Sequence, residues 1–316
     1  ETISNTCYLS EDNLVSGPIS RINNINVIPS PYLTGAMDEF FNHPLVPILE
    51  TTRGCPFACA FCADGVASKN KIHRYDSQKT KDELNYIAKR VKNMSELMMA
   101  DLNFGMYKQD IVTAKMIRDL QQTFNYPKTV DVSGGKNMPR RIIEVASIIK
   151  GWHLNAAIQS TDPDVLKAIS RDNISSSAYK ELINFGNNQN FAKTYSDIIL
   201  GLPGDTKQKH FESIRFAVDN DVSSIRMHQS ILLIGTSMAS KETREKYGLK
   251  TKFRTLPGTV GYYEMLGKKY PIAEIQEIII GSNTLTEKEY LDCRVMNLLV
   301  FTFFNNSQFE EVFALL

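Results

Sequence analysis

The sequence predicts an α/β fold: a partial (β/α)6 TIM-like barrel with an N-terminal connector and a C-terminal helical extension. Two observations indicate this class. Six short apolar segments alternate with stretches whose apolar residues recur at helical spacing, which is typical of parallel βαβ units with right-handed crossovers. Six such units are too few to close an eight-fold barrel, so we expect the barrel to stay open.

The chain divides into three expected parts. Residues 1–45 form an N-terminal arm, 46–235 form the partial barrel, and 236–316 form an extension that packs on the barrel. Within the arm, the run 23–32 ends in two closely spaced prolines and is expected to be extended, because residues before proline are pushed toward β or polyproline geometry. The arm is either an ordinary N-terminal segment or a linker from a domain upstream.

Apolar segments and helical periodicity place the elements of the barrel. Its strands are expected at 46–52, 96–101, 129–133, 154–159, 195–200 and 224–232. Its helices are expected at 79–93, 110–124, 139–150, 163–170, 175–185 and 206–218. The first helix shows the basis, since Leu84, Ile87 and Val91 recur at i, i+3 and i+7. Asp162 followed by Pro163 is a typical helix start.

The extension is expected to hold three further elements. A helix is expected over 236–247, ended by Gly248, and a strand over 275–280. A last helix is expected over 287–305, packed on the barrel.

Composition excludes several classes of protein. With 316 residues, 42% hydrophobic and 22% charged, the chain is ordinary for a globular protein with a sizeable core. Its net charge of +1 produces no field that would attract nucleic acid or an anionic membrane. No apolar run approaches the roughly 18 residues of a spanning helix. We therefore expect a cytoplasmic protein with no membrane span and no nucleic-acid partner.

Three of the five cysteines, Cys55, Cys59 and Cys62, stand in a CxxxCxxC pattern. Thiolates are soft ligands that suit iron–sulfur clusters and zinc. A closed zinc site needs four ligands, and Cys7 and Cys293 stand alone, so a zinc loop would need a distant ligand such as His73. A 4Fe–4S cluster held by three local thiolates would instead leave one iron open for a ligand outside the protein.

The run 50–62, with an aromatic residue before its last cysteine, resembles the cluster loop of the radical S-adenosylmethionine (SAM) superfamily. The resemblance extends from Pro29 to about Phe301. It implies a 4Fe–4S cluster on Cys55, Cys59 and Cys62, with SAM chelating the open iron. It also implies reductive cleavage of SAM to a 5′-deoxyadenosyl radical, a cofactor chemistry that the protein positions and shields.

Unusual residue groups follow the expected strands, whose C-terminal ends meet at one rim in an α/β barrel. They are the cysteine loop, Asn103-Phe104-Gly105, Ser133-Gly134-Gly135, Gln159-Ser160-Thr161 and Gly201-Leu202-Pro203-Gly204, while His228-Gln229 lie on the sixth strand itself. We therefore expect one shared pocket. His228 is the candidate catalytic residue on the substrate side, and its alternative is a structural strand histidine.

The resemblance suggests which residues bind SAM. The expected cofactor-binding residues are Phe61, Asp101, Asn103, Gly105, Ser133, Gln159, Ser160, Arg171, Ile199 and Leu200. The family's second-strand group holds the SAM amino group and has the consensus GGE. The run 101–105 departs from it but is similar to the cobalamin-associated branch. Either the Asp101 carboxylate or loop carbonyls near Asn103 would accept from the ammonium.

The remaining roles follow the same resemblance. The backbone at Phe61 would meet the adenine, on which Ile199 and Leu200 would pack. Gln159 and its neighbour Ser160 would bond the ribose hydroxyls or the carboxylate, and the guanidinium of Arg171 fits the SAM carboxylate. The alternative for Arg171 is a cation that faces a helix C-terminus.

The run 29–35 is similar to the connector that joins a cobalamin-binding domain to the radical core in one branch of the family. The expected function is therefore cobalamin-assisted methylation, or another radical transformation, of a small molecule whose identity the sequence does not indicate. The expected partner is an electron donor such as flavodoxin or ferredoxin. The alternatives are a cobalamin-independent oxidoreductase or sulfur-inserting enzyme, and a non-catalytic zinc-binding module.

Overall fold

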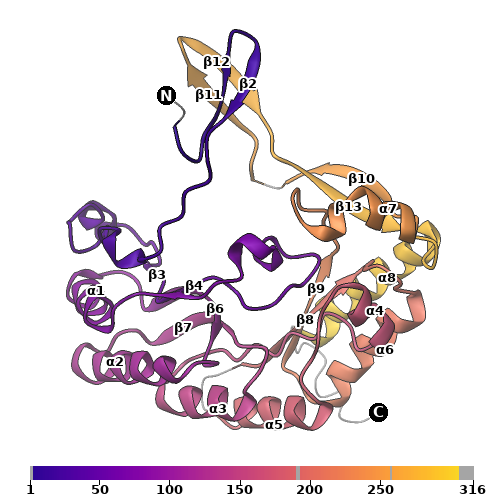
Figure 1. Cartoon of the computed structure of the whole chain (residues 1–316). Helices are drawn as coiled ribbons and strands as arrows, with labels where there is room; N and C mark the ends of the chain where they lie inside the picture. The colour runs from indigo at the N-terminus through magenta and orange to yellow at the C-terminus, as the bar shows by residue number, and fades with distance from the viewer. Residues whose placement is uncertain (1–2, 190–192, 257, 306–316) are drawn as a thin grey trace.

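The computed structural model describes residues 3–189, 193–256 and 258–305. Its centre is a series of parallel strands (Figure 1). They are β3 (Ile48–Leu49), β6 (Glu96–Phe104), β7 (Thr129–Gly134), β8 (Tyr195–Leu200) and β9 (Ser224–Gln229). The pairs β3–β6, β6–β7 and β8–β9 are all parallel, which confirms five of the expected strand positions. The result is a mixed α/β fold built from βαβ units.

The expected strand at 154–159 is not continuous, and this part of the prediction was wrong. The segment joins the two halves of the sheet only through isolated parallel bridges, Val130 with Trp152, Asn155 with Tyr195 and Gln159 with Ile198. The cause is local. The side chains of Arg171 and Asn173 donate hydrogen bonds to main-chain carbonyls of this segment. In addition, Gln159 has a φ of 62°, which is outside the range of strand residues.

The first strand is also shorter than the expected 46–52. After β3 the chain turns away at residue 50, and β4 (Thr52–Arg53) pairs antiparallel with β5 (His73–Arg74). The two-residue pairing closes the base of the loop that carries the cysteines. The loop therefore leaves the parallel sheet and returns to its edge.

Helices follow one another around the outside of the strands (Figure 1). They are α1 (Ser77–Arg90), α2 (Lys108–Phe124), α3 (Pro139–Ile148), α4 (Pro163–Ala168), α5 (Ser176–Asn187) and α6 (Lys207–Asp219). Each was expected within three residues of where it lies. Asp162 caps α4 by accepting from two main-chain N–H groups, as expected of Asp before Pro163.

The main core lies between these helices and the sheet. Leu84, Ile117 and Ile142 come from the helices, and Leu97 and Val130 from the strands, and all are almost fully buried. Burial of such side chains stabilises the fold by roughly 1.5–3 kcal/mol each. This core holds the strand ends, and the loops that follow them, in place.

The extension begins after β9 with a short 3-10 helix at Ser237–Ala239 and then α7 (Lys241–Tyr247). The left-handed Gly248 ends α7 as expected. Next come β10 (Lys250–Thr255) and β13 (Ile275–Gly281), which pair antiparallel. The chain continues as α8 (Glu287–Leu299) and a π-helical turn over Val300–Phe304, where one long helix was expected.

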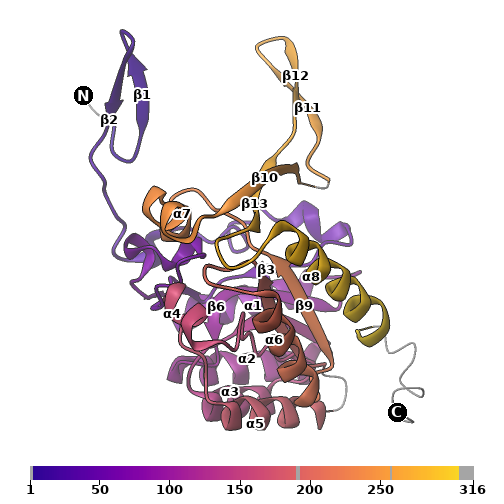
Figure 2. The same cartoon turned by 90° about the vertical axis from the view of Figure 1, so that its right-hand side faces the viewer.

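Two hairpins stand apart from the body of the molecule (Figure 2). One joins β1 (Cys7–Ser10) to β2 (Asn13–Ser16), and the other joins β11 (Gly261–Met265) to β12 (Lys268–Ile272). Neither hairpin was predicted from the sequence. A two-residue turn with two positive φ angles is usually marked by Asn-Gly, but the turn of the first hairpin is formed by Glu11 and Asp12.

None of the helices in the described part of the chain is both long and apolar enough to cross a membrane.

Candidate functional site

The three cysteines of the pattern lie on one loop beside the end of β3. Cys55 and Cys59 are buried and Cys62 is half-buried, and all three are free thiols. Gly54 allows the start of this loop to pass close to the main chain at Lys71. It has a φ of 100°, and a Cβ at this position would stand 2.2 Å from the carbonyl oxygen of Lys71. Only glycine fits both conditions, so the loop's entry is shaped by this residue.

Main-chain hydrogen bonds tie the loop to distant parts of the chain. The Ala60 N–H donates to the carbonyl of Ile169 at 2.8 Å, and the Met238 N–H donates to the carbonyl of Ala60 at 3.0 Å. Gly65 packs so closely that a Cβ there would lie 2.3 Å from the carbonyl oxygen of Cys59. The position of the thiols is therefore determined by the fold around them as well as by the loop itself.

Nitrogen donors surround the thiols. Lys136 Nζ lies 2.8 Å from Cys59 Sγ, and Asn103 Nδ2 donates to Cys55 Sγ at 3.3 Å. Arg171 is buried close by, and its burial lowers the pKa of the guanidinium while the charge of Cys59 opposes that shift. Positive groups favour the thiolate, which is the form that binds metal. Lys136 was missed by the sequence analysis, although it follows Gly134-Gly135 at the end of β7.

These contacts bear on what the loop could hold. Three thiols supplied by one loop, with two basic side chains toward Cys59, form a soft, thiolate-stabilising donor set that fits a 4Fe–4S cluster. Within the described residues, no three His, Cys, Asp or Glu side chains, the three cysteines included, stand close enough together to hold a metal ion as they lie. His73, the suggested fourth zinc ligand, lies on β5, where its backbone pairs with that of Arg53.

Asp101 on β6 supports the strand that leads to the loop. Its carboxylate accepts from the Thr51 N–H at 2.9 Å and from the Thr51 hydroxyl at 2.6 Å. Burial raises its pKa to about 6. Both oxygens are thus engaged with the protein, and the geometry favours Asn103 over Asp101 as a contact for a ligand. Asn103 Oδ1 is buried and has no partner among the described residues.

Gly105 and Ser133 differ in how the structure uses them. Gly105 has a φ of 84°, and a Cβ there would lie 3.2 Å from Ile142 Cα and from the ring of Trp152. This glycine therefore serves the turn between β6 and α2. Ser133 is exposed at the end of β7, on the same rim as the cysteine loop.

Gln159 and Ser160 lie where the irregular segment meets β8. Gln159 has its side-chain Oε1 buried and, like that of Asn103, without a partner among the described residues. Its backbone is fixed by a hydrogen bond from its N–H to the Asp197 carbonyl at 2.8 Å. Ser160 Oγ accepts from the N–H of Asp162 at 3.2 Å. Two unfilled buried acceptors, on Asn103 and Gln159, are the strongest signs of an absent polar ligand.

Arg171 is held more tightly than a free anion-binding side chain would be. Its guanidinium donates to Asn173 Oδ1 at 2.9 Å and to the carbonyl of Ala157. It was expected either to pair with a SAM carboxylate or to face a helix C-terminus. Its contacts fix the irregular segment and add positive charge beside Cys59.

Ile199 and Leu200 point to opposite faces of β8, as adjacent strand residues must. Ile199 and Phe61 both pack against a buried cluster that includes Ala60. Leu200 is fully buried in a different cluster, with Ile280 of β13 and residues of α8. Of the two, only Ile199 packs against the same cluster as Phe61, and the expected adenine contact of Leu200 finds no support in this geometry.

His228 lies on β9 beside Asp197 of β8. His228 Nε2 is 2.8 Å from Asp197 Oδ1, and Asn155 Nδ2 donates to the other carboxylate oxygen at 2.5 Å. Asp197 also acts electrostatically on Arg171, as the thiols do, so the His228 pair and the cysteine loop belong to one neighbourhood. Asp197 and Asn155 were missed, because each is a polar residue inside a mostly apolar segment.

Comparison with known proteins decides the family. Residues 49–217, more than half of the chain, match the family model described as the radical SAM superfamily. The chain belongs to the radical SAM superfamily. The matched range includes the cysteine loop and every expected cofactor-binding residue. Membership implies a 4Fe–4S cluster and SAM as cofactors, in agreement with the donor set described above.

Two curated proteins resemble this radical SAM chain along most of its length. It is 29% identical over 290 residues to 2-(S-pantetheinyl)-carbapenam-3-carboxylate methyltransferase of Streptantibioticus cattleyicolor, covering 87% of the chain and 41% of the relative. It is 28% identical over 297 residues to the cobalamin-dependent radical SAM methyltransferase TokK of Streptomyces tokunonensis, covering 88% and 41%. The chain spans about two fifths of the length of these relatives.

Among solved structures, the radical SAM methyltransferase TsrM of Kitasatospora setae, with tryptophan and a SAM analogue bound, has a TM-score of 0.58 with this chain. The sequence identity is 14%, and the match covers 70% of this chain and 43% of that one. At this identity the likeness concerns the fold alone.

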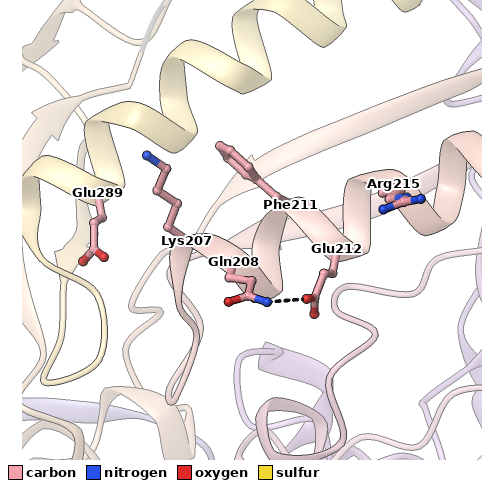
Figure 3. A pocket seen from close by; sticks show the side chains of 6 residues that line it. All are labelled: Lys207, Gln208, Phe211, Glu212, Arg215 and Glu289. Atoms are coloured by element: carbon pink, nitrogen blue, oxygen red, sulfur yellow. Dashed lines mark hydrogen bonds between the residues drawn. The ribbon is translucent and has the colours of Figure 1, made fainter.

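A hollow on the outer surface is separate from the radical SAM site (Figure 3). It is lined by Lys207, Gln208, Phe211, Glu212, Arg215 and Glu289, from α6 and the first turn of α8. None of the expected site residues lines it. Its polar side chains are paired with each other or with close neighbours, as Gln208 is with Glu212 at 2.8 Å.

Proposed function

We propose that this chain is the catalytic core of a cobalamin-dependent radical SAM methyltransferase that acts on a small molecule. The observation that carries the proposal is the cysteine loop with its surroundings: three thiols, two basic side chains directed at Cys59, and two buried acceptors with no partner among the described residues. The two curated relatives, one of them a cobalamin-dependent radical SAM methyltransferase, support methylation as the outcome.

In this proposal, Cys55, Cys59 and Cys62 hold the cluster. When bound, the cluster supplies the electron that cleaves SAM to 5′-deoxyadenosyl radical and methionine. Lys136 and Arg171 would offset negative charge at Cys59. This would stabilise the Cys59 thiolate and favour the reduced state of the cluster. The strands end at this rim, which keeps the thiols in a partly buried, water-poor setting.

The protein's own groups would also orient SAM. Asn103 Oδ1 and Gln159 Oε1 are buried acceptors, suited to an ammonium or to hydroxyl groups. Phe61 and Ile199 are partly buried apolar side chains against one cluster and would be suited to contact the adenine. Asp101 is a positioning residue in this scheme, since both of its oxygens bond to Thr51.

Further parts of the proposal concern the architecture. Support for a partial six-stranded barrel comes from the parallel series of strands and bridges between residues 48 and 229. Residues 1–45 would be the connector, 46–235 the barrel and 236–316 the extension. The full protein would contain a cobalamin-binding domain and would receive electrons from a donor such as flavodoxin or ferredoxin. Its location would be the reducing cytoplasm.

The test is anaerobic reconstitution of the chain with iron and sulfide, followed by reaction with SAM and a strong reductant. We expect a brown protein that releases 5′-deoxyadenosine, and a Cys59→Ala variant that does neither. A colourless zinc protein that leaves SAM intact would refute the proposal. For the full-length protein, bound corrinoid is expected, and its absence would favour a cobalamin-independent radical SAM enzyme.

A further inference from the structure

A groove lies between β9 and α8, on the side of β9 that has no strand neighbour among the described residues. It encloses about 400 Å³. Arg226 and His228 of the strand line it, as do Arg294 and Asn297 of the helix. No Asp or Glu is among its lining residues. A hollow with several nitrogen donors and no lining carboxylate favours an anion.

The two donors on β9 are held in fixed orientations. They occupy alternate positions of the strand and so project from the same face. The Arg226 guanidinium lies 3.7 Å from the ring centroid of Tyr195, and His228 is hydrogen-bonded to Asp197. Both oxygens of the Asp197 carboxylate are engaged, one by His228 and one by Asn155. The polar ends of both side chains are thus directed at β8, so the free donors of the groove come from the helix.

The helix contributes a buried group that lacks a partner. Asn297 is only 3% exposed, and its Oδ1 lies 2.9 Å from His210 Nε2, while its Nδ2 has no partner among the described residues. A buried donor left in this state costs roughly 1–3 kcal/mol. An acceptor on a ligand in the groove would remove that cost.

The rest of the groove is apolar. Leu298 and Phe301 of the α8 side stand along it with most of their surface uncovered. They offer an apolar wall next to the donors. Donors next to an apolar wall suit a molecule with one anionic end and one apolar end.

We propose that this groove binds a small molecule that carries a carboxylate or phosphate on an apolar body. Its use as the anchor for the substrate rests on the proposed function and on the place of His228 beside the cysteine-loop neighbourhood. Anion binding itself depends only on the groove. The anionic end would meet Arg294 and the Asn297 amide, and the apolar body would lie along Leu298 and Phe301.

Calorimetric titration of the reconstituted chain with hexyl phosphate tests the inference, with hexanol and inorganic phosphate as partial probes. Hexyl phosphate should bind more tightly than either. Arg294→Gln should weaken it about tenfold, since a charge-assisted hydrogen bond is lost. Arg215→Gln is the matched control, because it removes the same charge from an exposed position on α6. Unfolding curves would confirm that both variants are folded.

Equal affinities in Arg294→Gln and Arg215→Gln, or hexanol binding as tightly as hexyl phosphate, would overturn the inference. Cleavage of SAM by the wild-type chain is measured separately. If hexyl phosphate binds as expected but SAM is not cleaved, the groove stands and the proposed function fails. If SAM is cleaved and hexyl phosphate does not bind, the groove assignment is wrong.

Discussion

Replacement of Gly54 by alanine should reduce cluster loading to less than about half of the wild-type level while the rest of the fold survives. A Cβ at this position would lie 2.2 Å from the Lys71 carbonyl oxygen, whereas ordinary contact begins near 3.4 Å. One of the two segments would have to move by about 1 Å, far more than the roughly 0.2 Å tolerance of a metal–ligand distance. The left-handed φ of 100° adds about 1–3 kcal/mol of backbone strain. The neighbouring thiol, Cys55, would be displaced.

The assay measures iron and sulfide content and the visible spectrum after anaerobic reconstitution. The free energy of unfolding of the apoprotein is measured as well, to show that the variant is folded. We expect Gly54→Ala to retain less than about half of the wild-type iron. Gly267→Ala is the matched control, since it has a φ of 72° with nothing within 4 Å of its Cβ. Gly65→Ala isolates the clash alone, against the Cys59 carbonyl. Iron content in Gly54→Ala equal to that in Gly267→Ala would refute this reasoning.

Three further predictions follow from the site. Asn103→Ala should weaken SAM binding about tenfold with iron content near normal, because a buried acceptor is lost; unchanged SAM affinity would exclude Asn103 as a contact. Lys136→Gln should lower the cluster's reduction potential by on the order of 50 mV, since a cation 2.8 Å from Cys59 is removed, and a redox titration would measure it. Burial raises the pKa of Asp205 from 3.8 to about 7, so the folded chain holds a proton that the unfolded chain has lost, and stability falls as pH rises between those values. Asp205→Asn should flatten this fall in urea titrations, leaving the smaller contribution of Asp101; an unchanged slope would contradict the assignment.

The helices and the cysteine loop could be predicted from the sequence because their signals are local. The helical spacing of apolar residues placed α1 to α6, and Asp162 marked a helix start through its own hydrogen bonds. The cysteine pattern likewise needs no knowledge of distant residues. The comparisons confirmed the family on which the cofactors were predicted.

What could not be predicted depends on contacts between distant segments. The segment 154–159 has the composition of a strand, but Arg171 and Asn173 take its carbonyls from farther along the chain. Lys136 lies 77 positions from Cys59, and nothing in sequence spacing indicates that they touch. Asp197 meets His228 only because β8 pairs with β9.

The central claim is that a cluster held by three cysteines leaves one iron free for SAM. The most direct measurement is the electron paramagnetic resonance spectrum of the reduced, reconstituted chain before and after SAM is added. A 4Fe–4S signal whose g-values change on addition of SAM is the expected result. A cluster signal that SAM leaves unaltered, or a chain that takes up zinc and forms no cluster, would contradict the claim.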